Sequence, residues 1–155
     1  MNIDIVNGDL LKQDVEVIVN PWNQNIFPWW LLIPQGVSKK VRKEGGTQPF
    51  KELYKKGFMS LGSAILTQSG NLPFKGIIHV AGINLFWFAT KISIQKSVIN
   101  SIKIANKNHF NSIAFPLIGA GTGGMNNEKV LNIIKEALHS TTYKGRVLIV
   151  IYKKV

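Results

Sequence analysis

The amino-acid sequence predicts an α/β protein, a three-layer α/β/α sandwich around a mixed, mostly parallel central sheet. Strand-like and helix-like segments alternate along the chain, an order typical of sheets with helices on both faces. Several strand segments are almost continuously apolar, as strands buried on both faces are; these are VEVIVN (15–20), SIAFPLIG (112–119) and RVLIVIY (146–152). A length of 155 residues fits one core, so we expect residues 1–155 to form a single domain.

Periodicity and turn residues place the other elements. The further strands are 2–6, 63–69 and 76–82, and the helices are 37–46, 50–57, 93–108 and 127–140. We expect Ser93 to be the N-cap of the third helix, because its hydroxyl precedes a run of apolar residues at helical spacing. Residues 21–36 contain three prolines without periodicity, which predicts a long loop.

Composition excludes several classes of protein. The chain is 45% hydrophobic and 17% charged, as globular proteins are. It has no cysteine, which excludes disulfides and cysteine-ligated zinc, and nothing in the sequence calls for another metal or a cofactor. No secretory signal is visible at the start of the sequence, so we expect a cytoplasmic protein without membrane contact.

The strong positive charge favours partners that carry phosphate. The formal net charge is +11, and such a field speeds the encounter with nucleic acids and with nucleotide diphosphates. The basic residues are spread along the chain, and no basic stripe interleaved with aromatic residues is present. We therefore rank nucleic acid below a small nucleotide as the partner.

The sharpest local feature is GAGTGG (119–124), which follows a predicted strand and precedes a predicted helix. Closely spaced glycines let several main-chain N–H groups converge on one anion, and the helix dipole adds to the attraction. A tight strand-to-helix turn without a ligand is the alternative. The segment lacks the Gly-Lys-Ser/Thr of a Walker A loop, and it does not follow the first strand as a Rossmann fingerprint would.

Polar residues also follow the other predicted strands, where ligands bind in α/β sheets. Asp9 caps a turn or accepts a hydrogen bond from an exocyclic amine such as that of adenine. Asn20 and Asn23 serve the loop or hold ribose hydroxyls. Tyr152 packs in the core or stacks on a flat base.

No catalytic constellation can be identified from the sequence. His79 lies in the middle of a predicted strand, which favours a buried, hydrogen-bonded histidine over a catalyst. The chain contains neither a Ser-His-Asp arrangement, nor HExxH, nor paired carboxylates at a motif spacing. Hydrolysis therefore has no evident general base.

The segment PWWLLIP (28–34) is unusually apolar for a loop. It is too short for a transmembrane helix, which needs about 20 apolar residues. It packs as core, covers a ligand, or meets a protein partner.

Taken in order, these segments resemble the macro domain, an α/β/α module that binds ADP-ribose. The resemblance covers nearly the whole chain through NGDLLKQDVEVIVNPWN (7–23), GSAILTQSGNLPFKGIIHVAG (62–82), SIAFPLIGAGTGG (112–124) and VLIVIY (147–152). No single segment decides the assignment, but the ordered set is specific.

The resemblance implies a role for each matching residue. Asp9 would bind the adenine amine beside the main chain of Leu10, and Tyr152 would face the adenine ring. Asn20 and Asn23 match the strand-end asparagines, and Asn23 would approach the distal ribose. The two phosphate loops would be formed by Gly36 and Val37, and by Gly119, Ala120, Gly121, Thr122, Gly123 and Gly124.

Departures from the family pattern bear on catalysis. Ser38 stands where hydrolytic members of the commonest class carry an aspartate, and a hydroxyl cannot replace a carboxylate that activates water. Gly123 stands where members of the family often carry an aromatic residue that covers the distal ribose. In another class of the family, an aspartate at this position accompanies a lysine nucleophile. Lys91 in ATK is similar to that lysine but stands too close to the second loop; an exposed lysine at a helix start is the other interpretation.

These features favour a protein that binds ADP-ribose or a derived nucleotide, free or attached to a macromolecule, as a reader or sensor. The alternative is a hydrolase of ADP-ribosyl groups, ADP-ribose-1″-phosphate or O-acetyl-ADP-ribose, for which Asn23, Ser38 and Lys91 are the candidates. Trp22, Trp29 and Trp30 lie in the first loop and are expected to wall the distal-ribose end.

Overall fold

Six strands form one sheet with the order β1-β6-β5-β2-β4-β3. The computed structural model describes residues 1–23, 34–84, 86 and 88–153. The strands are β1 (Asn2–Gly8), β2 (Val17–Asn23), β3 (Ala64–Thr67), β4 (Gly76–Ile83), β5 (Ser112–Pro116) and β6 (Arg146–Tyr152). All neighbouring pairs are parallel except β3 with β4, so the predicted mixed, mostly parallel sheet is confirmed.

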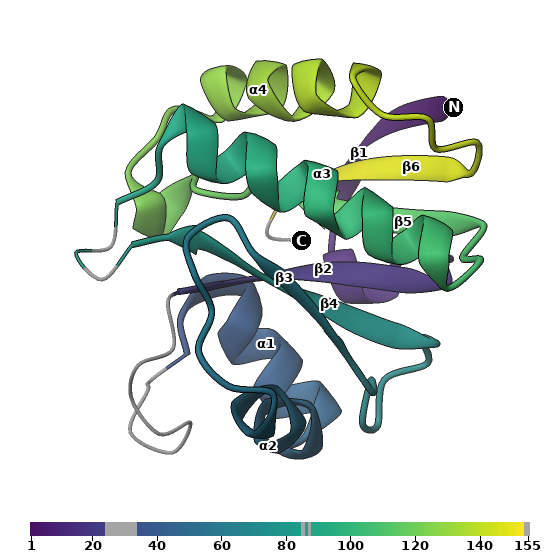
Figure 1. Ribbon diagram of the computed structural model, residues 1–155, viewed down its shortest axis with the longest axis vertical. Coiled ribbons are helices and arrows are strands. Elements are labelled where there is room, and N and C mark those ends of the chain that lie inside the picture. The colour runs from purple at the N-terminus through teal and green to yellow at the C-terminus, as the bar shows by residue number, and fades with distance from the viewer. Residues whose placement is uncertain (24–33, 85, 87, 154–155) are drawn as a thin grey trace.

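The helices cover both faces of this sheet (Figure 1). They are α1 (Gly36–Gly45), α2 (Gln48–Lys55), α3 (Lys91–Lys107) and α4 (Asn127–His139), with 3₁₀ turns at Leu10–Lys12 and Gly121–Gly123. In Figure 1, α3 and α4 lie on one side of the sheet and α1 and α2 on the other. The predicted three-layer sandwich is therefore confirmed.

Alternation along the central strands explains why they are apolar throughout. Val17 and Val19 of β2 join the core beneath α3 and α4, whereas Ile18 between them joins the core on the α1 and α2 side. Successive strand side chains point to opposite faces. Each central strand therefore has apolar residues at most positions, which fill both cores; Asn20 and His79 are buried polar exceptions.

The sheet opens between β2 and β5. β2 pairs with β5 at Val17 and Ile18 and then leaves it, while β2 stays paired with β4 as far as Asn23. The predicted loop 21–36 is thus corrected at its start, because β2 continues through Pro21. Proline lacks an N–H, and a strand tolerates it where one side is unpaired. The diverging carboxyl ends of β2 and β5 leave room for a site.

The start of α3 also differs from the prediction. Thr90, not Ser93, is the N-cap, and its hydroxyl accepts a hydrogen bond from the Ser93 N–H at 3.0 Å. The Ser93 hydroxyl in turn accepts one from the Thr90 N–H at 3.0 Å, completing a capping box. A serine at the third helical position here replaces the usual glutamate of a capping box. The N-cap therefore lies three residues earlier than predicted, at Thr90 instead of Ser93.

Candidate functional site

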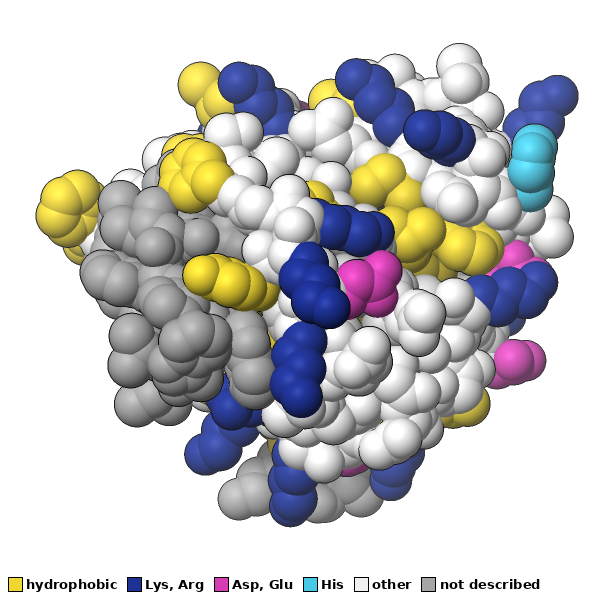
Figure 2. All heavy atoms as spheres, turned by 60° about the horizontal axis from the view of Figure 1, so that its bottom comes forward, with side chains coloured by type: hydrophobic (Ala, Val, Ile, Leu, Met, Phe, Trp, Pro, Cys, Tyr) yellow, Lys and Arg dark blue, Asp and Glu magenta, His cyan; other side chains and the backbone are white. Residues whose placement is uncertain are grey.

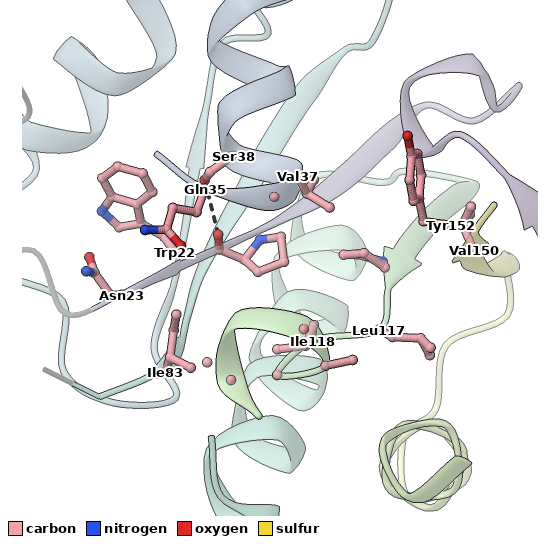
Figure 3. A pocket seen from close by; sticks show the side chains of 18 of the residues that line it. Trp22, Asn23, Gln35, Val37, Ser38, Ile83, Leu117, Ile118, Val150 and Tyr152 are labelled. Carbon is pink, nitrogen blue, oxygen red and sulfur yellow. Dashed lines mark hydrogen bonds between the residues drawn. The ribbon is translucent and has the colours of Figure 1, made fainter. Parts of the chain in front are cut away.

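A cavity of about 270 Å³ lies beyond the carboxyl ends of β2, β5 and β6. Figure 3 shows Tyr152 and Val150 at one end, Trp22 and Asn23 at the other, and Val37 and Ser38 between them. Its lining comes from Pro21, Trp22, Asn23, Pro34, Gln35, Gly36, Val37, Ser38, Gly82, Ile83, Pro116, Leu117, Ile118, Gly119, Ala120, Gly121, Gly123, Asn127, Val150, Ile151 and Tyr152. The cavity joins the predicted segments after β2 and β5 with Tyr152, whereas Asp9 and Leu10, which follow β1, are not among the residues that line it.

The first wall is the N-terminus of α1. Gly36, Val37 and Ser38 form the first turn of this ten-residue helix and line the cavity. Main-chain N–H groups in the first turn have no partner within the helix, and the side chain of the N-cap residue Gln35 makes no capping hydrogen bond. These N–H groups and the helix dipole make the wall suited to an anion.

The second wall is the glycine loop after β5. Gly119 and Gly121 have positive φ angles of 85° and 66°, which glycine adopts without steric cost. A Cβ added to Gly119 would meet Ala89 Cβ at 2.5 Å, and one added to Gly123 would meet the same atom at 3.1 Å. Ala89, just before α3, therefore packs into the space that side chains on this loop would fill. A side chain at position 123 would require Ala89 to shift by a few tenths of an ångström.

A buried chain of hydrogen bonds runs from the cavity into the sheet. The Ser38 hydroxyl donates to Asn20 Oδ1 at 2.9 Å or to the Pro21 carbonyl at 3.1 Å. Asn20 Nδ2 donates to His79 Nδ1 at 3.0 Å. His79 then donates through Nε2 to Thr67 Oγ1 at 2.9 Å, and Thr67 donates to the Gln68 carbonyl at 3.0 Å.

The structure places Asn20 beneath the cavity. Asn20 is fully buried, both atoms of its amide are engaged by Ser38 and His79, and it does not line the cavity. Its side chain contacts Ser38, which does line the cavity. Ser38 lines the cavity, but its only proton is directed into the protein.

His79 is the buried, hydrogen-bonded histidine that the sequence favoured. Burial, together with the positive charge of Lys56, lowers the pKa of His79 to about 3. The ring also packs edge-on against Phe50, with ring centroids 5.6 Å apart. His79 is neutral at physiological pH and does not line the cavity, so it has no place as a general base for a ligand there.

Lys40 of α1 contacts both Asp9 and Tyr152; Tyr152 lines the cavity at its β6 end, whereas Asp9 and Lys40 lie outside its lining. Asp9 Oδ1 accepts a hydrogen bond from the Leu11 N–H at 3.0 Å, and Oδ2 is paired with Lys40 Nζ. Although burial alone would raise the pKa of Asp9, the hydrogen bonds from Lys40 and Leu11 lower it. Lys40 Nζ also lies 5.9 Å from the centroid of the Tyr152 ring. The Leu10 side chain is buried beside this group.

Trp22 and Asn23 leave polar atoms unsatisfied at the opposite end. Trp22 is 5% exposed and its ring packs against Phe50 with centroids 5.3 Å apart. Trp22 Nε1 and Asn23 Oδ1 are buried without a hydrogen-bond partner in the described part of the chain. A buried donor and acceptor without partners are costly, so they point to a bound group that satisfies them.

Other predicted residues lie elsewhere. Lys91 begins α3, is exposed, and pairs with Glu136 of α4 at 3.0 Å; it is not part of the cavity. Gly124 ends the glycine loop in a left-handed conformation, after the turn that contains Thr122. Trp29 and Trp30 lie outside the described residues.

Two absences hold for the described ranges of the chain. No group of three or more His, Asp or Glu side chains there is arranged to hold a metal ion. No helix there is both long and apolar enough to cross a bilayer.

Sequence reasoning missed Lys40. In the sequence, Lys40 contributes only to the net charge. Its position four residues after Gly36 places it one helical turn beyond the phosphate wall, and this spacing was the available signal. Ala89 carried no comparable signal, because its contact with the glycine loop depends on the tertiary fold.

Comparison with known proteins identifies the family. The model of the Macro domain family matches residues 19–134. The chain belongs to the macro domain family. An O-acetyl-ADP-ribose deacetylase of Escherichia fergusonii is 30% identical over 130 residues, which are 79% of this chain and 70% of that protein.

Solved macro domains share the fold. The Oceanobacillus iheyensis macrodomain with ADP superposes with a TM-score of 0.79 at 23% identity, covering 97% of this chain and 83% of that chain. The Trypanosoma brucei macrodomain in complex with ADP-ribose has a TM-score of 0.80 at 18% identity, covering 98% of this chain and 64% of that chain.

Proposed function

We propose that this macro domain binds ADP-ribose, or a nucleotide derived from it, as a reader or signal sensor. One observation carries the proposal: the N-terminus of α1 and the glycine loop face one cavity that ends at Tyr152 on one side and at Asn23 on the other (Figure 3). Main-chain N–H groups on both walls suit a diphosphate between two flat or polar ends.

The orientation of the ligand follows from its two ends. The exposed ring of Tyr152 beside Asp9 suits a base that stacks and donates a hydrogen bond. Trp22 Nε1 and Asn23 Oδ1 suit the hydroxyl groups of the distal ribose or a group attached to it, because a hydroxyl both donates and accepts. The adenine would thus lie at the β6 end and the distal ribose at the β2 end.

The cavity is better suited to binding than to hydrolysis. Of the described residues that line it, none is Asp, Glu or His, and the Ser38 proton is engaged by Asn20 or by the Pro21 carbonyl. A general base within reach of a water molecule is therefore missing from this part of the chain.

Hydrolysis of an acylated or ADP-ribosylated substrate is the second candidate. The similarity to a deacetylase favours it, and Asn23 at the distal end could orient water. Incubation with O-acetyl-ADP-ribose and with an ADP-ribosylated protein, followed by mass spectrometry of the products, distinguishes the two candidates. Release above the buffer rate that is lost in Asn23→Ala would establish the enzyme.

Calorimetric titration with ADP-ribose tests binding directly. We expect one-to-one binding that AMP, which lacks the second phosphate and the distal ribose, does not match. Absence of heat at millimolar ADP-ribose would overturn the proposal.

Nucleic acid remains a secondary partner. Figure 2 shows Lys and Arg side chains in several separate groups over one face rather than in a continuous stripe. An affinity that falls by several orders of magnitude between low and physiological salt would indicate a polyanion, because many phosphate contacts release many counterions. For a site that binds a single nucleotide, we predict that the affinity depends only weakly on salt concentration.

The tryptophans of the first loop belong to the same proposal. We expect Trp22, together with Trp29 and Trp30, to wall the distal-ribose end. Unchanged ADP-ribose affinity in a folded Trp29→Ala/Trp30→Ala variant would reject the contribution of the latter two.

A further inference from the structure

Lys40 already makes both contacts that the proposed function assigns to the base. Its ammonium group is paired with Asp9 Oδ2 and lies 5.9 Å from the centroid of the Tyr152 ring. We propose that Lys40 occupies the base subsite of the free protein and must leave it when ADP-ribose binds. This inference rests on the proposed function, and it makes Lys40 the residue that determines how much affinity the base contributes.

The competition between Lys40 and the base arises at one carboxylate oxygen. Asp9 Oδ1 accepts the Leu11 N–H at 3.0 Å and so caps the turn Leu10–Lys12. Oδ2 is the oxygen that faces Lys40. An amine of the base that approaches Asp9 therefore meets Lys40 at this atom.

The Tyr152 ring offers a second point of competition. Tyr152 is 64% exposed at the end of β6 and lines the cavity. A cation near an aromatic face is attracted to the ring, and a stacked base needs the same face. Stacking on the side of the ring that Lys40 occupies requires the ammonium group to move.

A second partner is available to the displaced side chain. Glu44 lies four residues after Lys40 on α1, and lysine and glutamate at this spacing are neighbours on a helix. The hydrogen bond to Asp9 is the main cause of the raised pKa of Lys40, and Glu44 contributes to it as well. Lys40 can therefore exchange Asp9 for Glu44 by rotation of its side chain, without movement of the helix.

The test compares Lys40→Met with Lys39→Met by calorimetric titration. Methionine keeps the length and apolar stem of lysine but removes the charge. Lys39→Met removes the same charge from the adjacent, exposed position of α1, so it controls for the general attraction of the protein for an anion. Each protein is titrated with ADP-ribose and with inorganic pyrophosphate, which has no base.

We expect Lys40→Met to bind ADP-ribose about 3 to 10 times more tightly than Lys39→Met, because a partly buried ion pair and a cation–π contact no longer have to be broken. The two variants should bind pyrophosphate equally. Equal or weaker ADP-ribose binding by Lys40→Met would overturn the inference and leave the proposed function standing. If neither the wild type nor Lys40→Met binds ADP-ribose, the proposed function fails and this inference fails with it.

Discussion

Asn20 Nδ2 donates a hydrogen bond to His79 Nδ1 over 3.0 Å in the interior of the sheet. This contact joins the strand that leads into the cavity, β2, to its neighbour β4. It also fixes the amide of Asn20 so that Oδ1 faces the Ser38 hydroxyl. A buried chain of hydrogen bonds therefore supports the floor of the cavity. Its acid-sensitive member is the imidazole of His79.

Replacing His79 by glutamine should remove an acid dependence of stability. The pKa of His79 is about 3 in the folded protein and 6.5 in the unfolded chain. Between these values the unfolded chain takes up a proton that the folded protein does not, so stability falls as the pH falls. We expect the wild type to lose about 2 kcal/mol of unfolding free energy between pH 7 and pH 5, and His79→Gln to lose little.

Urea denaturation at several pH values measures this loss. The pKa values of Asp9 and Glu16 are also lowered, from 3.8 and 4.5. Their contributions are lost mainly below pH 5, which leaves the window above it to His79. A slope that is the same in both proteins would show that His79 is not neutral and buried as described.

Ser38→Ala should lower stability much more than ligand affinity. The substitution leaves the buried Asn20 Oδ1 without its donor, which costs about 1–3 kcal/mol. The main-chain N–H groups of α1 are kept, so we expect ADP-ribose affinity to change by less than about threefold. Ser101→Ala is the control, because its buried hydroxyl donates to Ser97 O on α3 at 2.7 Å, away from the cavity. A tenfold loss of affinity without loss of stability would place the Ser38 hydroxyl on the ligand instead.

Gly119→Ala should distort the glycine loop. Its φ of 85° is unfavourable for alanine, and the new Cβ would lie 2.5 Å from Ala89 Cβ. We expect a loss of about 2–4 kcal/mol of stability and at least a tenfold loss of ADP-ribose affinity. Gly57→Ala is the matched control, since Gly57 has a φ of 93° but no heavy atom within 4 Å of the added Cβ. Thermal unfolding and calorimetry measure both effects.

A rescue experiment separates the steric clash from backbone strain. Ala89→Gly removes the atom that Gly119→Ala would contact, so the double variant should regain part of the lost affinity. Failure of Ala89→Gly to restore any binding would assign the defect to the backbone conformation of residue 119 and to the contact with Ile94 Cδ1 at 3.2 Å, which Ala89→Gly leaves in place.

Trp22→Phe should weaken binding while leaving the fold intact. Phenylalanine keeps a ring against Phe50, and the indole N–H that it removes has no partner in the described part of the chain. Because phenylalanine is smaller than tryptophan and leaves a cavity at this buried position, we expect a loss of about 1–3 kcal/mol of unfolding free energy. ADP-ribose affinity should fall about tenfold, the usual worth of a hydrogen bond in a cavity. Equal affinity would mean that the indole donates to no ligand atom.

Much of this fold is predictable from the sequence because it depends on local signals. Buried strands such as β5 (Ser112–Pro116), shorter than the predicted 112–119, and β6 (Arg146–Tyr152) are apolar on both faces, and Gly45 and Gly46 mark the end of α1. The start of α3 was misplaced because Ser93 is a common N-cap residue, but here it serves the third position of a capping box begun by Thr90. The propensity of a single residue does not predict such a pair of reciprocal hydrogen bonds.

The site was predictable in outline but not in its contacts. The glycine loop, Asn23 and Tyr152 follow strands and do line the cavity. Asn20 follows the same rule but is buried, with its amide bonded to Ser38 of α1 and to His79 of β4. These contacts join residues far apart in the sequence, so no local pattern predicts them.

The most direct test of the central claim is a crystal structure of the protein with ADP-ribose. We predict the diphosphate between the N–H groups of Gly36–Ser38 and the glycine loop, the adenine beside Tyr152, and the distal ribose within hydrogen-bond distance of Trp22 Nε1 or Asn23 Oδ1. A ligand bound in the reverse orientation, or at another surface, would contradict the account.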